Sequence, residues 1–156
     1  MAHVLGLDLS KRRGAIVAFT DGSYTTHYKF GINKLEDAYQ NTEWFLDDLG
    51  LDSTVDKFAY VEAPVVGRGG AKVTIDQSFV SGVVQLCLDR HGWAVDLVNV
   101  QSWKKHVVGA GNSSKDQVAD WVDLNHGAVA RGFGADQDLY DAFCVGLYGV
   151  PLHSSS

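Results

Sequence analysis

The sequence has few cysteines, no long apolar run and no excess of positive charge. Its two cysteines, Cys87 and Cys144, stand in apolar, helix-like segments, so we expect buried free thiols in a reducing compartment. The absence of a CxxC motif or a Cys/His cluster argues against a zinc site. No apolar run approaches the roughly 18 residues that a membrane span needs, and the first ten residues, MAHVLGLDLS, lack the plan of a signal peptide. We therefore expect an intracellular, cytoplasmic protein without membrane contact.

The charge balance is acidic, with 19 Asp and Glu residues against 13 Lys and Arg residues and a formal net charge of −6. Proteins that bind nucleic acids use Lys and Arg at the phosphates, so this total argues mildly against such a partner. The distribution of charge matters more than its sum. Basic residues gather in SKRRG (10–14), GRGGAK (67–72) and SWKKH (102–106), with Lys115 just beyond. The net charge therefore does not by itself exclude a nucleic-acid partner.

Nucleotide-binding motifs are also missing. The segment GAGN (109–112) resembles part of a phosphate-binding loop, but it lacks the Lys-Ser/Thr ending of a Walker motif. No GxGxxG follows a predicted strand. We therefore expect no nucleotide cofactor.

The pattern of apolar residues predicts one α/β domain over residues 1–150 and a flexible tail over residues 151–156. The chain is 46% hydrophobic, which suits a single core. Strands are predicted at 3–9, 14–20, 23–30, 58–63 and 93–100. Asp21-Gly22 indicates a hairpin, so the first three strands should form an antiparallel meander. The later strands should join in parallel through crossover helices, which gives a five-stranded mixed sheet flanked by helices.

Capping signals place the helices between these strands. Asn33 with Glu36, and Ser113 with Asp116, have the spacing of capping boxes. The helix predicted from about residue 73 to residue 90 is apolar around much of its girth. Either a second subunit or neighbouring helices could cover its second apolar face.

Acidic residues at the start of the C-terminal helix raise the question of function. Asp138 and Asp141 are three residues apart, so a helix places both on one face. Apolar residues, which should pack in the core, continue that face further along the helix. Acids in a first turn also stabilise the helix dipole and cap backbone N–H groups, which is the simpler interpretation. Asp8 and Glu62, however, stand near the ends of two strands that should be neighbours. Ligands of open α/β sheets lie at the carboxyl ends of strands, so all four acids could meet there.

Four carboxylates in one place repel one another unless a cation holds them. All-oxygen ligands suit Mg²⁺ or Mn²⁺. Two such ions, bridged by carboxylates about 4 Å apart, catalyse in-line phosphoryl displacement and need no Ser, Cys or His nucleophile. We therefore favour a two-metal site over helix capping.

Four segments together resemble the RuvC-type Holliday-junction resolvases of the RNase H-like superfamily. These are VLGLDLS, FAYVEAP, VVGAGNSSKDQVADWV and DLYDAFCVGLYG, in the family's order over nearly the whole chain. The resemblance implies an RNase H-like fold, with Asp8, Glu62, Asp138 and Asp141 as metal ligands. It also implies that Lys115 lies near the scissile phosphate.

The same resemblance implies a homodimeric endonuclease that uses two Mg²⁺ ions per active site to nick opposing strands of a four-way DNA junction. Mn²⁺ should substitute for Mg²⁺. Bacterial members are generally more basic and carry an aromatic residue shortly after the matching Glu, where this chain has EAPVVGRGG. A viral member with relaxed specificity for branched DNA, active in the host cytoplasm, fits these departures.

Seven residues near the predicted site are candidates for DNA binding. Ser10, Lys11 and Arg12 follow Asp8, where ordinary turn chemistry is the competing interpretation. The other four lie by the two Gly-rich loops, where solvated charge is the alternative: Arg68, Lys72, Lys104 and Lys105.

Three other functions remain as alternatives. An RNase H-like nuclease would recognise RNA–DNA hybrids through their A-form geometry and 2′-hydroxyl groups. A binding module would hold branched DNA without cutting it, but all four acids are present. An ATPase half related to sugar kinases would need a second, duplicated domain, for which 156 residues are too few.

Overall fold

The structure, a computed structural model, describes residues 2–67 and 69–153. Five strands form one sheet, in the order β3-β2-β1-β4-β5. Their bounds are β1 (Ala2–Leu9), β2 (Arg13–Thr20), β3 (Ser23–Gly31), β4 (Asp56–Glu62) and β5 (Ala94–Val98). β1 pairs antiparallel with β2, and β2 with β3, whereas β4 runs parallel to both β1 and β5. The predicted mixed sheet, a meander extended by parallel strands, is confirmed.

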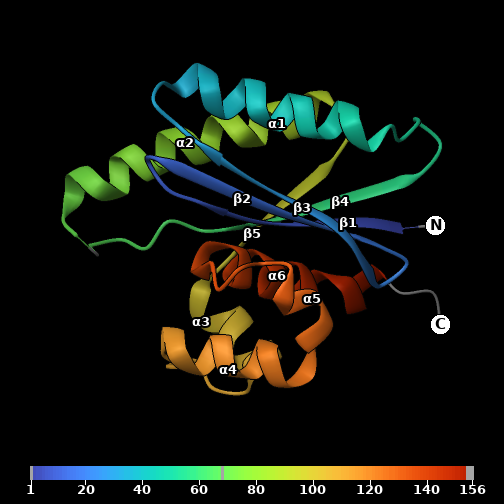
Figure 1. Cartoon of the computed structure of the whole chain (residues 1–156). Helices are drawn as coiled ribbons and strands as arrows, with labels where there is room; N and C mark the ends of the chain where they lie inside the picture. The colour runs from blue at the N-terminus through green and yellow to red at the C-terminus, as the bar shows by residue number, and fades with distance from the viewer. Residues whose placement is uncertain (1, 68, 154–156) are drawn as a thin grey trace.

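Helices cover both faces of this sheet (Figure 1). α1 (Leu35–Leu49) and α2 (Ala71–Arg90) pack together on one face. The other face carries α6 (Gln137–Gly149), with α3 (Val100–Trp103), the π-helical turn η1 (Lys104–Val108), α4 (Lys115–Asn125) and α5 (Gly127–Arg131) beyond it. Alternate residues of each strand therefore enter two separate hydrophobic clusters, one on each side.

α6 lies directly on the sheet because glycines stand at the points of contact. A Cβ at Gly6 of β1 would come within 2.1 Å of the carbonyl oxygen of Ala142. A Cβ at Gly146 of α6 would come within 2.2 Å of the ring of Phe19. Larger residues at either position would lift the helix, so this close approach fixes the height of α6 above β1.

Two helix starts differ from the prediction by one residue. α4 is capped by Ser114, whose Oγ accepts a hydrogen bond from the backbone N–H of Gln117, while the Gln117 side chain accepts from the N–H of Ser114. α1 begins after Lys34, and the Asp37 carboxylate accepts from the N–H groups of Asn33 and Lys34. At α4 the reciprocal pair one residue later supplies the cap, whereas at α1 the Asp37 carboxylate alone supplies the side-chain contacts.

Residues 151–153, the described part of the predicted tail, contact the sheet. Val150–His153 form a 3-10 turn. The His153 ring stacks on Phe58 with a centroid separation of 3.5 Å, and its Nε2 hydrogen-bonds the hydroxyl of Tyr60. Residues 151–153 therefore dock against β4, contrary to the expectation of a flexible tail from residue 151.

Among the described residues, one face of α2 has no covering element. Ile75, Phe79 and Leu86 lie on this face with exposed side chains, whereas Val73, also exposed, lies on another side of the helix. The helix is therefore not wedged between the sheet and neighbouring helices, which was one of the two explanations of its apolar girth. Within the described ranges, no helix has both the length and the apolar character to cross a membrane.

Candidate active site

Two neighbouring parallel strands deliver the first two acids. The register pairs Leu7 of β1 with Val61 of β4. Asp8 is the next residue after Leu7 and Glu62 the next after Val61, so the two acids lie side by side at the carboxyl ends of these strands. Leu7 and Val61 belong to the hydrophobic cluster beneath α1 and α2. Because side chains alternate along a strand, Asp8 and Glu62 face the opposite side, toward α6.

α6 brings Asp141 to the same place. Carboxylate oxygens of Asp8, Glu62 and Asp141 all lie within 4.8 Å of one another, and the three residues are partly buried. Burial, followed by the charges of Glu62 and Asp141, raises the pKa of Asp8 well above its ordinary value. Burial and the charge of Glu62 raise the pKa of Asp141 to about 7. The three carboxylates therefore repel one another in a partly dehydrated site.

The donor set of this acidic triad fits a divalent metal ion. It consists of carboxylate oxygens alone, which suits a hard cation such as Mg²⁺ or Mn²⁺ better than zinc or copper. A cation among the three oxygens would offset the burial and the charge repulsion that together raise the pKa of Asp8. The triad can therefore hold a metal ion.

Asp138, predicted as the fourth metal ligand, stands apart from this triad. Its Oδ2 accepts from Nε of Arg13 at 2.8 Å and lies 3.0 Å from Nζ of Lys29. Helix capping, the alternative interpretation of the acids, applies instead to Asp136, whose Oδ1 accepts from the N–H of Leu139. The three acids at the start of α6 thus have three different roles: a cap, an ion-pair partner and a member of the triad.

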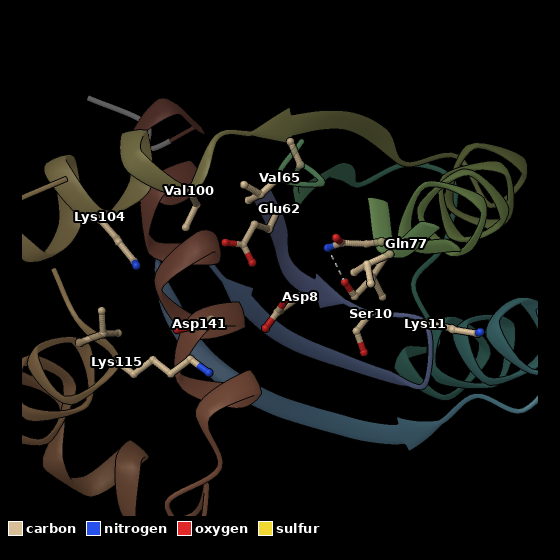
Figure 2. Close-up of a pocket in the computed structure, with 14 residues that line it drawn as sticks. Asp8, Ser10, Lys11, Glu62, Val65, Gln77, Val100, Lys104, Lys115 and Asp141 are labelled. Carbon is tan, nitrogen blue, oxygen red and sulfur yellow. Dashed lines mark hydrogen bonds between the residues drawn. The ribbon is translucent and has the colours of Figure 1, made fainter. Parts of the chain in front are cut away.

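The triad lines a cavity of about 250 Å³ that also contains basic residues. Lys104 from η1 and Lys115 from the first turn of α4 line it on one side. Figure 2 shows both side chains reaching toward the carboxylates, with Ser10 and Lys11 on the other side of Asp8. Lys104 also lowers the pKa of Asp141, against the larger effects of burial and Glu62. A negatively charged ligand in this cavity would meet the ammonium groups of Lys104 and Lys115.

The other predicted DNA-binding residues that the structure describes do not reach toward the carboxylates as Lys104 and Lys115 do. Lys11 and Lys72 both pair with Asp76 of α2, at 3.3 Å and 3.0 Å. The hydroxyl of Ser10 accepts from the N–H of Arg13 and donates to its carbonyl, as in ordinary turn chemistry. Two further candidates are exposed and do not line the cavity: Arg12 and Lys105. Arg68 lies outside the described residues.

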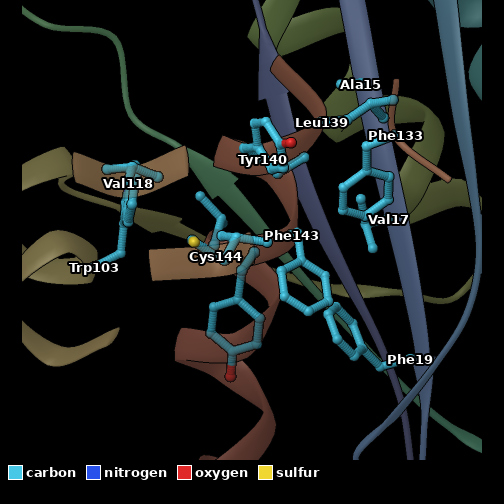
Figure 3. Close-up of a cluster of buried hydrophobic side chains, with 14 of the residues drawn as sticks. Ala15, Val17, Phe19, Trp103, Val118, Phe133, Leu139, Tyr140, Phe143 and Cys144 are labelled. Carbon is cyan, nitrogen blue, oxygen red and sulfur yellow. The ribbon is translucent and has the colours of Figure 1, made fainter. Parts of the chain in front are cut away.

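Two positioning contacts were not predicted. The indole N–H of Trp103 donates to Oε1 of Glu62 at 3.2 Å, and Nε2 of Gln137 donates to Oδ1 of Asp141 at 3.0 Å. Trp103 is fully buried, and Figure 3 shows it beside Val118 in the hydrophobic cluster around α6. The spacing of Gln137 and Asp141 at i and i+4 could have indicated their contact, whereas no sequence signal links Trp103 to Glu62.

Comparisons with known proteins bear on the fold. No protein-family model matches the sequence, and a search of curated proteins gives no significant match. The RuvC structure of Thermus thermophilus superposes with a TM-score of 0.71 at 14% sequence identity, covering 97% of both chains. RuvC of the same organism in complex with a Holliday junction substrate gives a TM-score of 0.75 at 14% identity, covering 97% of this chain and 94% of that one. The chain therefore has a RuvC-like fold of the RNase H type.

Proposed function

We propose that this chain is a divalent-metal-dependent endonuclease that cuts branched DNA, four-way junctions above all. The observation that carries the proposal is the triad of Asp8, Glu62 and Asp141, which sits at the edge of a RuvC-like sheet with lysines beside it. RuvC with this fold has been solved with a Holliday junction substrate, which supports the choice of substrate.

Mg²⁺, or Mn²⁺ in its place, would lower the pKa of a bound water and neutralise charge that develops on the phosphate. Asp8 would take part in holding both ions, since its carboxylate lies within 4.8 Å of those of Glu62 and Asp141. Glu62 would hold one ion, and Asp141 with Asp138 the other. Trp103 and Gln137 keep the Glu62 and Asp141 carboxylates turned into the site by occupying one oxygen of each.

The lysines of the cavity would hold the scissile phosphate. Lys115 and Lys104 line it beside the triad, and an ammonium group there offsets the negative charge that the acids present to DNA. Lys115 is exposed at the start of α4, so it can reach a phosphate that enters from solvent. We assign Lys115 to stabilise the phosphate in the transition state.

The reaction is hydrolysis of one phosphodiester bond. A water oxygen forms a bond to phosphorus, the bond from phosphorus to the 3′ oxygen breaks, and that oxygen takes up a proton. The products are a 5′-phosphate and a 3′-hydroxyl. No protein nucleophile is needed. The described residues that line the cavity include neither cysteine nor histidine, and the hydroxyl of their one serine is bonded within a turn.

The substrate range should be broad among branched DNAs. After Glu62 the chain continues with Ala63, Pro64, Val65 and Val66 and offers no aromatic ring to stack on a junction base. Recognition would then depend on phosphate contacts, which carry no base sequence. We place this activity in the cytoplasm, where the buried free thiols of Cys87 and Cys144 stay reduced.

We propose that a second copy of the chain covers the apolar face of α2. Paired nicks in a symmetric junction require two active sites, and the chain supplies one triad among its described residues. Exposed fractions of 52% at Ile75, 58% at Phe79 and 48% at Leu86 leave a hydrophobic surface that a homodimer would bury.

Cleavage of a labelled, immobile four-way junction tests the activity. Wild type and Asp8→Asn are incubated with Mg²⁺ and the junction, a linear duplex, a replication fork or an RNA–DNA hybrid. Asp48→Asn is the matched control, because Asp48 is an exposed acid of α1 on the opposite face of the sheet. Wild type and Asp48→Asn should nick the junction symmetrically, and Asp8→Asn should bind it without cutting.

The outcomes separate the alternatives. Nicks in forks as well as junctions indicate a general debranching nuclease that uses the same site. Cleavage restricted to the hybrid would replace the proposal with an RNase H-like activity. Binding without cleavage by all three proteins would leave a branched-DNA-binding module and overturn the metal-dependent mechanism.

A further inference from the structure

Two cations lie on the sheet face that carries the acidic triad. Along β2, Arg13 continues the row of Ala15 and Val17, which pack under α6. Lys29 of β3 alternates with Tyr28, whose ring joins the cluster on the opposite face. Strand alternation therefore aims Arg13 and Lys29 at the N-terminal end of α6.

Both cations bind the same oxygen of Asp138. Nε of Arg13 lies 2.8 Å from Oδ2 of Asp138, and Nζ of Lys29 lies 3.0 Å from it. Lys29 also binds Oδ2 of Asp136 at 2.6 Å. The side chains of Lys29 and Asp138 are 26% and 25% exposed, so the pair is partly shielded from water.

The acids of the triad have no such partners. In the part of the chain that the structure describes, neither Lys nor Arg forms an ion pair with Asp8, Glu62 or Asp141. Two of these acids accept hydrogen bonds from neutral side chains instead, those of Trp103 and Gln137. The four predicted metal ligands therefore differ in their partners. Among the described residues, the triad forms no ion pair with Lys or Arg, whereas Asp138 forms ion pairs with Arg13 and Lys29.

We propose that Lys29 and Arg13 form a clamp that withholds Asp138 from metal binding and so imposes an order on metal loading. The first ion enters the triad of Asp8, Glu62 and Asp141. The second ion needs Asp138 and binds weakly until the clamp opens. This inference rests on the proposed function, because it concerns the metal ions that the nuclease would use.

Two physical effects make the clamp oppose the second ion. Oδ2 of Asp138 already accepts from two cations, so an ion must displace one of them or use the other oxygen. An ion beside Asp138 would also lie within a few ångströms of two fixed positive charges, in a partly dehydrated region where charge repulsion is strong. Lys29 is the main element of the clamp, because Arg13 has a side chain 61% exposed, where solvent screens its charge.

Calorimetric titration of the DNA-free protein with Mn²⁺ tests the clamp without measuring cleavage. Wild type should bind one ion per chain, with a second at least tenfold weaker or undetectable. Lys29→Met should tighten the second ion at least tenfold and leave the first unchanged. Arg13→Gln should also tighten the second ion, but by a smaller factor. It tests the clamp independently if Lys29→Met fails to fold. Asp138→Asn should abolish the second ion in every background.

Lys11→Met is the matched control, because Lys11 lines the cavity of the triad and pairs with Asp76 rather than with Asp138. If Lys11→Met tightens the second ion as much as Lys29→Met, general charge removal explains the effect and the clamp is refuted. Unchanged or weaker second-ion binding in both Lys29→Met and Arg13→Gln refutes it as well. If wild type binds no Mn²⁺ at all, with or without branched DNA, the proposed function itself fails.

Discussion

The indole N–H of Trp103 donates a hydrogen bond to Oε1 of Glu62, across 41 residues of sequence. Trp103 is fully buried at the end of α3, so the packing of its ring fixes the direction of that N–H. One oxygen of Glu62 is thereby held, and the carboxylate keeps its orientation toward Asp8 and Asp141. Contacts of this kind orient metal ligands, and their loss typically costs about 10- to 100-fold in metal affinity.

We therefore expect Trp103→Phe to weaken Mn²⁺ binding at the triad by about tenfold or more. Trp93→Phe is the matched control, since Trp93 is a buried indole in the opposite hydrophobic layer. Both changes leave a cavity and should lower the free energy of unfolding by roughly 1–3 kcal/mol. Titration calorimetry and thermal unfolding separate the two effects. Equal metal affinity in the two variants would show that the hydrogen bond to Glu62 has no positioning role.

Metal-free protein should lose stability as the pH rises. Burial and Glu62 raise the pKa of Asp141 to about 7, from an ordinary 3.8. Between these values the folded chain binds a proton that the unfolded chain has released, so this contribution to stability is complete below about pH 4 and is lost by about pH 7. The free energy of unfolding should fall by a few kcal/mol over this pH range, on the order of the energy that such a pKa shift represents.

Urea unfolding with a chelator, at pH 5 and pH 8, measures this dependence. Asp141→Asn carries no titratable group at that position and should make the profile less steep, with Asp8 still contributing, and should be more stable than wild type at pH 8. Mg²⁺ should raise the stability of wild type at pH 8 much more than that of Asp141→Asn. A wild-type profile that stays flat or rises between these two pH values would contradict the repulsion inferred for the triad.

The contact between Gly6 and α6 sets the height of Asp141 above the sheet. A Cβ at Gly6 would approach the carbonyl oxygen of Ala142 to 2.1 Å, and Ala142 follows Asp141 directly. Gly6→Ala should therefore destabilise the fold by about 3 kcal/mol or more and displace the triad. Gly31→Ala, at the end of β3, is the control, because a Cβ there would meet nothing within 4 Å, and it should change stability by less than about 1 kcal/mol. Thermal unfolding of both variants provides the measurement, and a stable Gly6→Ala protein would contradict the close approach.

Strand ends and the triad could be predicted from the sequence because local patterns determine them. Apolar runs that end in Asp8 and Glu62 indicated the two strand edges, and the parallel arrangement of β1 and β4 follows from the crossover between them. The role of Asp138 could not be predicted, because its partners come from β2 and β3, more than 100 residues earlier in the chain. A sequence pattern shows which residues are charged, but the sheet decides which charges meet.

Helix caps show the same limit on a smaller scale. Ser113 and Ser114 are both capable caps, and the sequence pattern favoured Ser113 with Asp116. In the structure Ser113 donates to the carbonyl of Ala110, and Ser114 caps the helix. The preceding loop decides between the two serines, since it places a carbonyl acceptor beside the first one.

Lys115 should contribute to the rate of cleavage rather than to the fold. It is exposed and lines the cavity beside Asp141, so Lys115→Met removes a charge without leaving a buried void. We expect kcat for junction cleavage to fall about 100-fold, as is typical when one group that stabilises transition-state charge is lost. Lys105→Met, an exposed lysine outside the cavity, is the control and should keep kcat within about threefold of wild type. Single-turnover cleavage with saturating protein measures the step directly, and equal rates for the two variants would remove Lys115 from the mechanism.

The apolar face of α2 gives a prediction about assembly. Phe79 is 58% exposed at the middle of that helix, between Ile75 and Val83. Phe79→Glu should convert a dimer to a monomer, because a second copy would have to bury two unpaired carboxylates at the centre of the interface. Leu124→Glu is the control, since Leu124 is 85% exposed on α4 and away from α2.

Analytical ultracentrifugation distinguishes these variants. Wild type and Leu124→Glu should sediment as dimers and Phe79→Glu as a folded monomer with a lower melting temperature, since it loses the stabilisation that association provides. On a four-way junction, the monomer should produce single nicks in place of paired ones, because each chain carries its own triad. If wild type sediments as a monomer on and off the junction, the exposed face of α2 requires another partner, and paired cleavage must come from two chains that meet on the DNA alone.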